Sequence, residues 1–314
     1  MMKLNFKRGL GLAIVAVLIA GVASAWAPDR TVDELKGRWA QAPSQFVEVD
    51  GMQVHLRDEG PRDDPHPIVL LHGTSDSLHT WDGWADGLKA TRRVVRMDMP
   101  GFGLTGPNPT GDYTLMSYVG FVDHVLARVG VKQAVVAGNS LGGEIAWLLG
   151  VHHPERVERL VLIDSGGYPF KAEGMPIGFR LARILALQPL TTRLLPRKTI
   201  EDSVKSVFGH PDQVTPELVD RFYELTLRAG NRASLIQRFQ QAPIGALAEQ
   251  VKQVKQPTLV LWGGQDHLIP PANAQRFAQD IPGTSVVMFD DLGHVPQQED
   301  PTRTLAAARA FMSP

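Results

Sequence analysis

The chain has 314 residues, 43% of them apolar and 21% charged, and this composition excludes extensive disorder because it allows a sizeable buried core. Its 32 lysines and arginines nearly balance 33 aspartates and glutamates, so no basic field is available for a phosphate backbone and we expect no nucleic-acid partner. The absence of cysteine excludes disulfides, thiolate metal ligands and cysteine nucleophiles.

The N-terminus has the pattern of an export segment. Three basic residues among the first eight precede an uncharged stretch over residues 9–28, and Ala23-Ser24-Ala25 offers the small residues of a signal-peptidase site. Residues 1–25 are therefore predicted to be a cleaved signal peptide or an N-terminal membrane anchor, since 20 uncharged residues can span a hydrocarbon core about 30 Å thick. Either alternative predicts a periplasmic, secreted or membrane-anchored protein with its folded part outside the cytoplasm.

After a linker over residues 26–44, the pattern alternates between strands and helices. Two strands over residues 46–49 and 52–58 flank Asp50-Gly51, a dipeptide that favours a hairpin turn. Short runs that are apolar on both faces are typical of strands covered by helices on both sides. They predict six more strands, over residues 68–71, 94–97, 134–137, 160–163, 258–261 and 286–289. Helical periods lie between them, so we predict a doubly wound, mostly parallel α/β sheet.

One interval interrupts this alternation. Residues 168–250 contain helical pieces and seven prolines but no convincing strand. One piece begins clearly, because Thr215 is suited to cap a helix and Pro216 to the first helical position. We therefore predict a helical cap over residues 168–250, inserted between two strands of a core formed by residues 45–167 and 251–314.

The cap is expected to influence substrate choice. Residues 175–195 are more apolar than a short exposed helix requires, so some of them are expected to line an acyl pocket, while ordinary packing explains others and none is assigned as a ligand. The cap carries 11 lysines and arginines against 8 aspartates and glutamates. This excess is compatible with anionic substrates and equally with a solvated surface.

The segment Gly138-Asn139-Ser140-Leu141-Gly142 matches the pattern G-x-S-x-G between a predicted strand and a predicted helix. A tight strand-to-helix turn needs glycines and leaves the serine hydroxyl exposed. A serine hydroxyl is a weak nucleophile on its own, so this motif requires a histidine and an acid elsewhere in the chain.

Suitable partners follow two later strands. Asp266 comes after the strand at 258–261 and His294 after the strand at 286–289, and the order Ser, Asp, His along the chain is typical of one fold. Asp164 also follows a strand and competes with Asp266 for the role of the acid. The later position of Asp266, beyond a Gly-Gly turn, favours it.

With these residues in place the chain resembles the α/β-hydrolase family. His72-Gly73, residues 98–103, residues 138–143, Asp266 and His294 stand in family positions, and the resemblance covers about residues 45–312. It implies that Ser140 attacks a carbonyl, that His294 is the base and that Asp266 orients the imidazole. It also implies an oxyanion hole made by the backbone N–H groups of Leu141 and Thr74.

The expected activity is the hydrolysis of small-molecule carboxylic esters through an acyl-enzyme, without a metal or another cofactor. A serine at position 140 disfavours dehalogenases and epoxide hydrolases, whose resemblance would require aspartate there. Hydrolases that cleave carbon–carbon bonds of dienone ring-fission products have a similar elbow, although they usually carry an aromatic residue where this chain has Val295. A non-catalytic binding module is the third alternative, disfavoured because all three residues of the triad are kept.

Overall fold

A computed structural model describes residues 21–313. The predicted signal peptide or anchor therefore lies almost wholly outside the described residues. Within the described part of the chain, no helix has the length and apolar character needed to cross a membrane.

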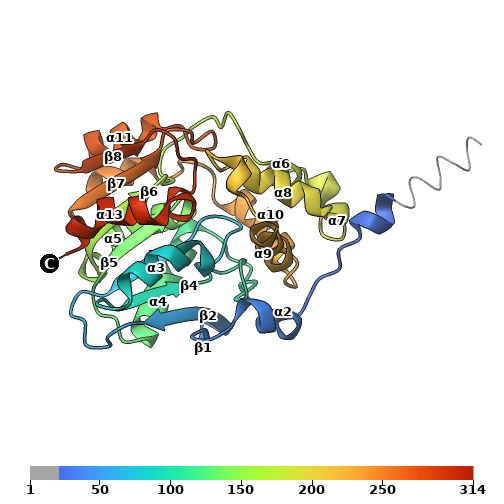
Figure 1. Cartoon of the computed structure of the whole chain (residues 1–314), viewed down its shortest axis with the longest axis horizontal. Coiled ribbons are helices and arrows are strands. Elements are labelled where there is room, and N and C mark those ends of the chain that lie inside the picture. Colours follow the sequence, from blue (N-terminus) through green and yellow to red (C-terminus); the bar gives the residue numbers. More distant parts are fainter. Residues whose placement is uncertain (1–20, 314) are drawn as a thin grey trace, which may run out of the picture.

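The core is an eight-stranded sheet with the order β1-β2-β4-β3-β5-β6-β7-β8 (Figure 1). The strands are β1 (Gln45–Val49), β2 (Met52–Glu59), β3 (Ile68–Leu71), β4 (Val94–Met97), β5 (Ala134–Asn139), β6 (Val157–Ile163), β7 (Thr258–Gly263) and β8 (Ser285–Phe289). β2 pairs antiparallel with β1 and with β4, and all other pairs are parallel. The predicted doubly wound, mostly parallel sheet and its antiparallel edge hairpin are thus confirmed.

Helices cover both faces of the sheet because alternate strand residues feed two separate cores. In β3, Val69 and Leu71 belong to one apolar cluster, and Ile68 and Leu70 belong to the other. The first cluster includes α4 (Leu115–Arg128), α5 (Leu141–His152) and α11 (Ala272–Asp280), and the second includes α3 (Asp82–Leu88) and α13 (Pro301–Met312). The short α12 (Pro296–Glu299) precedes α13.

The predicted helical insertion lies between β6 and β7, as expected. It contains α6 (Ile177–Ala182), α7 (Gln188–Thr191), α8 (Arg197–Lys205), α9 (Pro216–Thr226) and α10 (Asn231–Gln241), which group at one end of the sheet in Figure 1. Thr215 caps α9 by accepting a hydrogen bond from the Leu218 N–H at 3.2 Å. We call residues 168–250 the cap.

The segment over residues 26–44, expected to be a linker, instead contains helix α2 (Val32–Trp39). Thr31 and Glu34 form a capping box at its start, a signal readable in the sequence. Leu35 and Trp39 are buried in a cluster with Leu225 of α9. This segment therefore packs against the cap, because its two large apolar side chains need a surface to cover them.

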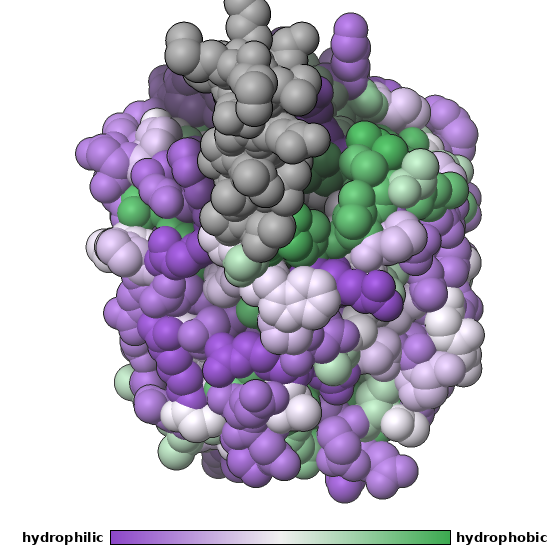
Figure 2. Space-filling model, turned by 90° about the vertical axis from the view of Figure 1, so that its right-hand side faces the viewer, coloured by the Kyte–Doolittle hydropathy of each residue, from purple (hydrophilic) through white to green (hydrophobic). Residues whose placement is uncertain are grey.

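The surface of the cap is partly apolar. Figure 2 shows apolar side chains gathered on the side of the molecule where the described chain begins. The exposed large apolar residues of the cap include Ile177, Ile184, Leu185 and Leu190, and Trp26 is also exposed. The backbone around Trp26 is tied to the cap, since Ala27 N donates to Arg193 O at 3.0 Å and Leu195 N donates to Ala25 O at 2.8 Å.

Candidate active site

Ser140 stands at a strained turn between β5 and α5. Its backbone has φ 56° and ψ −116°, a conformation that costs a non-glycine residue about 1–3 kcal/mol and clusters at functional sites. Ser140 N donates to Ile163 O at 3.0 Å, and Ser140 O accepts from Gly166 N at 2.9 Å. Bonds to the neighbouring strand and the loop after it therefore maintain the strained conformation.

The glycines of the motif are required by close backbone packing. A Cβ on Gly138 would collide with the carbonyl of Gly142, and a Cβ on Gly142 would collide with the carbonyl of Leu71 at the end of β3. These neighbours are backbone atoms that cannot move aside. The G-x-S-x-G pattern thus follows from the sterics of the turn.

The structure joins His294 to Asp266. Their Nδ1 and Oδ2 atoms are 2.7 Å apart in a buried hydrogen bond. The other oxygen of Asp266 accepts from the N–H groups of Leu268 and Ile269 at 2.8 and 2.9 Å. An ionised carboxylate only accepts, so this hydrogen bond places a proton on Nδ1 of His294 and leaves Nε2 as the ring nitrogen that Asp266 does not bind.

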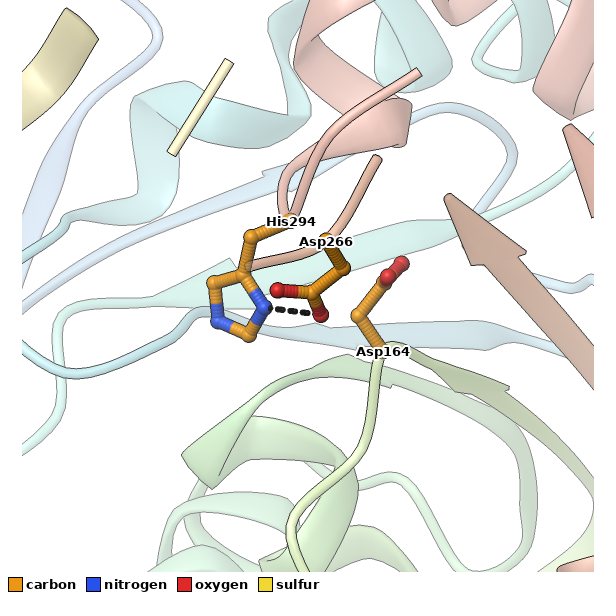
Figure 3. A group of neighbouring side chains, drawn as sticks. All are labelled: Asp164, Asp266 and His294. Atoms are coloured by element: carbon orange, nitrogen blue, oxygen red, sulfur yellow. Dashed lines mark hydrogen bonds and ion pairs between the residues drawn. The ribbon is translucent and has the colours of Figure 1, made fainter. Parts of the chain in front are cut away.

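Asp164, the competing acid, lies beside Asp266 without contacting the imidazole (Figure 3). It is fully buried, its Oδ1 accepts from Gly263 N at 3.0 Å, and its Oδ2 has no partner among the described residues. Burial, and after it the negative charge of Asp266, raises the pKa of Asp164 well above its ordinary value. A proton on Asp164 avoids two adjacent buried charges.

Two further side chains, to which no role was assigned from the sequence, hold the loop of His294 in place. Asn139 Nδ2, next to the nucleophile, donates to His294 O at 2.9 Å. The carboxylate of Glu299 accepts from the N–H groups of Gly209, His210 and Gly293 at 3.0, 2.8 and 3.0 Å. The His294 N–H donates to Val207 O at 2.8 Å. The cap segment and the histidine loop are therefore held together, a long-range arrangement with no local sequence signal.

The loop predicted to carry one oxyanion donor is ordered by His72. Nδ1 of His72 lies 2.7 Å from Gly73 O, and its Nε2 accepts from Met99 N at 2.9 Å. Thr74 and Leu141 both line the same cavity as Ser140 and His294. The Leu141 N–H is in the first turn of α5, where N–H groups have no partner within the helix, and the Thr74 N–H donates to no other described backbone group. Both are available to bind an oxyanion.

The cavity lies between core and cap, opens to solvent and has a volume of about 220 Å³, enough for a small-molecule ligand. Five of the apolar residues expected between 175 and 195 do line it, and they are Met175, Phe179, Leu181, Leu194 and Leu195. The charged residues of its wall are Asp76, Glu144, Arg183, Arg232 and Arg238, none of which the sequence analysis singled out.

Asp164, Asp266 and His294 also offer oxygen and nitrogen atoms within 4.8 Å of one another, a spacing compatible with a metal ion. The hydrogen bond between His294 and Asp266 accounts for most of this closeness, and a metal on Nδ1 would have to replace it. The expectation that no metal or other cofactor takes part stays a prediction.

Comparison with known proteins decides the family. A family model described as the alpha/beta hydrolase fold matches residues 66–301, which is most of the chain. This protein belongs to the alpha/beta hydrolase family. The strained serine after β5 and the His294–Asp266 hydrogen bond are thus features of an alpha/beta hydrolase, with the cap inserted after β6.

Individual relatives are named for different substrates. The chain is 29% identical over 287 residues to a 2-hydroxymuconate semialdehyde hydrolase of Pseudomonas putida, covering 87% of this chain and 97% of that protein. The structure of the present chain is similar to that of a membrane phospholipase A described as a bacterial virulence factor. The TM-score is 0.74 and the sequence identity 24%, and the match covers 99% of this chain and 98% of that chain. Est816, described as degrading N-acyl homoserine lactones, matches with TM-score 0.67, 27% identity and coverage of 85% and 99%. The relatives therefore include enzymes named for different substrates, and the substrate class of this alpha/beta hydrolase is a separate question.

Proposed function

We propose that this alpha/beta hydrolase is a carboxylic ester hydrolase that forms an acyl-enzyme on Ser140. The observation that carries the proposal is the shared cavity, whose wall contains Ser140, His294, Thr74 and Leu141. Nε2 of His294 takes the proton of the serine hydroxyl, which attacks the ester carbonyl, and then gives this proton to the leaving alcohol. Asp266 holds the imidazole through its hydrogen bond to Nδ1, and the Thr74 and Leu141 N–H groups hold the oxyanion.

Water then completes the reaction with the same residues. His294 removes a proton from a water molecule that attacks the acyl-enzyme, and Ser140 leaves with that proton as the acid is released. These steps use only protein groups, so we expect ester hydrolysis to be unaffected by EDTA. A loss of activity in EDTA that Zn²⁺ restores would contradict this expectation.

Carbon–carbon bond hydrolysis is the second candidate, favoured by the similarity to the 2-hydroxymuconate semialdehyde hydrolase. Val295, which follows His294, lines the cavity. The family resemblance implies an aromatic residue at this position in carbon–carbon bond hydrolases. The ester proposal is preferred because this chain has valine there. A preference for a dienone acid over every simple ester would reverse it.

The deciding experiment measures hydrolysis of 4-nitrophenyl esters from acetate to palmitate by the full-length protein. Ser140→Ala should abolish turnover, because no other hydroxyl occupies the elbow, and the exposed Ser206→Ala is the matched control that should leave turnover unchanged. Retained hydrolysis in Ser140→Ala would refute the acyl-enzyme. A folded wild-type protein that cleaves no ester would refute the ester proposal and leave the carbon–carbon alternative.

We further propose that the folded part works outside the cytoplasm, either released by cleavage after Ala25 or anchored through residues 9–28. Support comes from the basic and apolar N-terminal sequence and from the exposed apolar residues of the cap near Trp26. Intact mass of the expressed protein would distinguish cleavage from anchoring. Protection of the folded part from protease added to spheroplasts would contradict export.

A further inference from the structure

The wall of the active-site cavity contains a charged pair whose members lack partners. Arg238 of α10 and Glu144 of α5 line this cavity and are only 8% and 7% exposed. Nε of Arg238 and Oε1 of Glu144 have no hydrogen-bond partner among residues 21–313. Leaving a buried charge without a partner is costly, typically several kcal/mol.

The other charged residues of the cavity wall have a partner for their charge or are exposed. Arg232 contacts Asp29 at 2.6 Å through one terminal nitrogen, although its Nε and Nη1 have no partner among the described residues. Asp76 accepts from the Ser77 N–H at 2.8 Å, and Arg183 is exposed to water. The ring of Phe239, whose centroid is 5.5 Å from the Arg238 guanidinium carbon, offers only a weak interaction. Among the described residues, Arg238 is therefore the buried arginine of this wall that no carboxylate contacts in an ion pair.

The charge of a ligand that would complement Arg238 and Glu144 follows from the ionisation states of these two side chains. Arginine stays charged at any ordinary pH. Burial raises the pKa of Glu144 to about 7, although the positive charge of Arg238 acts to lower it, so a large fraction of Glu144 is neutral at neutral pH. The pair then carries a positive charge and one available O–H donor. Its complement is a ligand with one negative charge and two acceptor oxygens.

From this arrangement we infer that Arg238 and Glu144 form a subsite for a carboxylate carried by the substrate. A carboxylate matches the planar fork of arginine, and the neutral Glu144 can donate to it as well. A phosphate monoester dianion would bring one charge too many. This inference deepens the proposed function, because it assigns the ester substrate an acidic group, and its kinetic test rests on that function.

The subsite is close to the reacting serine along α5. Glu144 follows Ser140 by four residues, one helical turn or about 6 Å. The substrate carboxylate would thus lie several bonds away from the carbonyl that Ser140 attacks. Half-esters of medium-length dicarboxylic acids, or esters of hydroxy acids, satisfy this spacing.

The kinetic test compares substrates that differ only in the carboxylate. On the acyl side, mono-4-nitrophenyl adipate is compared with 4-nitrophenyl hexanoate, and on the alcohol side, the butyrate ester of 4-hydroxybutanoate is compared with butyl butyrate. We expect the wild type to prefer the acidic member of one pair in kcat/KM. Arg238→Gln should reduce that preference about 10- to 100-fold, the usual loss for a charge-assisted hydrogen bond, and Arg238→Lys should restore part of it.

Arg180→Gln is the matched control, because it removes an exposed arginine of the same cap that does not line the cavity. This control should keep the preference of the wild type. Equal losses on acidic and neutral esters in Arg238→Gln, or no acidic preference in the wild type, would overturn the subsite.

A binding measurement separates this inference from the proposed hydrolysis. In Ser140→Ala, hexanoate should raise the melting temperature and hexanol should not, and Arg238→Gln added to that variant should abolish the hexanoate effect. Hexanoate binding that depends on Arg238 in an enzyme that cleaves no ester would support the subsite and refute ester hydrolysis. Ester hydrolysis without any such binding or preference would support the function and refute the subsite.

Discussion

The pair of buried aspartates gives the sharpest test of the site. His294 contacts Asp266 at 2.7 Å, whereas Asp164 is a neighbouring buried carboxyl whose pKa is raised by burial and by the charge of Asp266. Asparagine has the shape of a protonated aspartate. We therefore expect Asp164→Asn to change kcat/KM less than about tenfold, or 1.4 kcal/mol, while Asp266→Asn should reduce kcat about 10⁴-fold, as in serine proteases.

The same pair predicts the direction of a pH effect on stability. A carboxyl with a raised pKa in the folded state keeps its proton while the unfolded chain loses it, so its contribution to stability falls as pH rises above about 4. Asp164→Asn lacks this titration. The free energy of unfolding of the variant relative to the wild type should therefore rise by about 1.4 kcal/mol per pH unit up to the folded pKa. For a chain of this length, that is about 2 °C in melting temperature per pH unit.

The assay combines thermal unfolding from pH 5 upward with ester kinetics at one pH. Asp63→Asn, an exposed position, is the matched control and should show neither effect. A constant stability difference across the pH range would show that Asp164 does not hold the proton. A kcat loss of about 10⁴-fold in Asp164→Asn with near-normal Asp266→Asn would move the role of the acid to Asp164.

Three further predictions follow from the site. Gly142→Ala should abolish esterase activity and lower the melting temperature, because its Cβ collides with the Leu71 carbonyl, and normal values for both would contradict the steric argument. Glu299→Ala leaves three backbone N–H groups without their acceptor and should destabilise the protein by about 3 kcal/mol, measured by denaturant unfolding and contradicted by a loss below about 1 kcal/mol. The preference for acidic over neutral esters should fall as pH rises through about 7, because Glu144 ionises there and repels the substrate carboxylate. Glu144→Gln should make the ratio of kcat/KM for the acidic ester to kcat/KM for the neutral ester independent of pH. Groups whose titration affects both esters equally cancel in this ratio. If the ratio still falls with pH in Glu144→Gln, another group causes the effect.

Much of the fold could be predicted because its signals are local. The predicted strand at 68–71 coincides with β3 and the one at 94–97 with β4, since a short run with both faces buried must be apolar throughout. Helix α2 was missed although its Thr31–Glu34 capping box is visible in the sequence. This short amphipathic helix is stabilised mainly by packing against α9, which lies far along the chain.

The site, like the fold, has some residues that local sequence signals identify and others that they do not. Ser140 could be located from the sequence because the glycines around it are a local steric requirement, and two aspartates remained as candidates for the contact with His294. Glu144 could have been singled out from the sequence as an acid in an otherwise apolar helix. Arg238 could not, because it lies in a segment with the pattern of an ordinary amphipathic helix.

The sequence by itself determined the order of the strands, the helical insertion between β6 and β7, and the tight serine turn, because periodicity and backbone sterics act between near neighbours. Only the tertiary structure decided that His294 contacts Asp266, that Glu299 ties the cap to the histidine loop, and that Arg238 shares the cavity wall with Glu144. These contacts join residues far apart in the chain. Their geometry depends on how the sheet and the cap pack together, which no local pattern encodes.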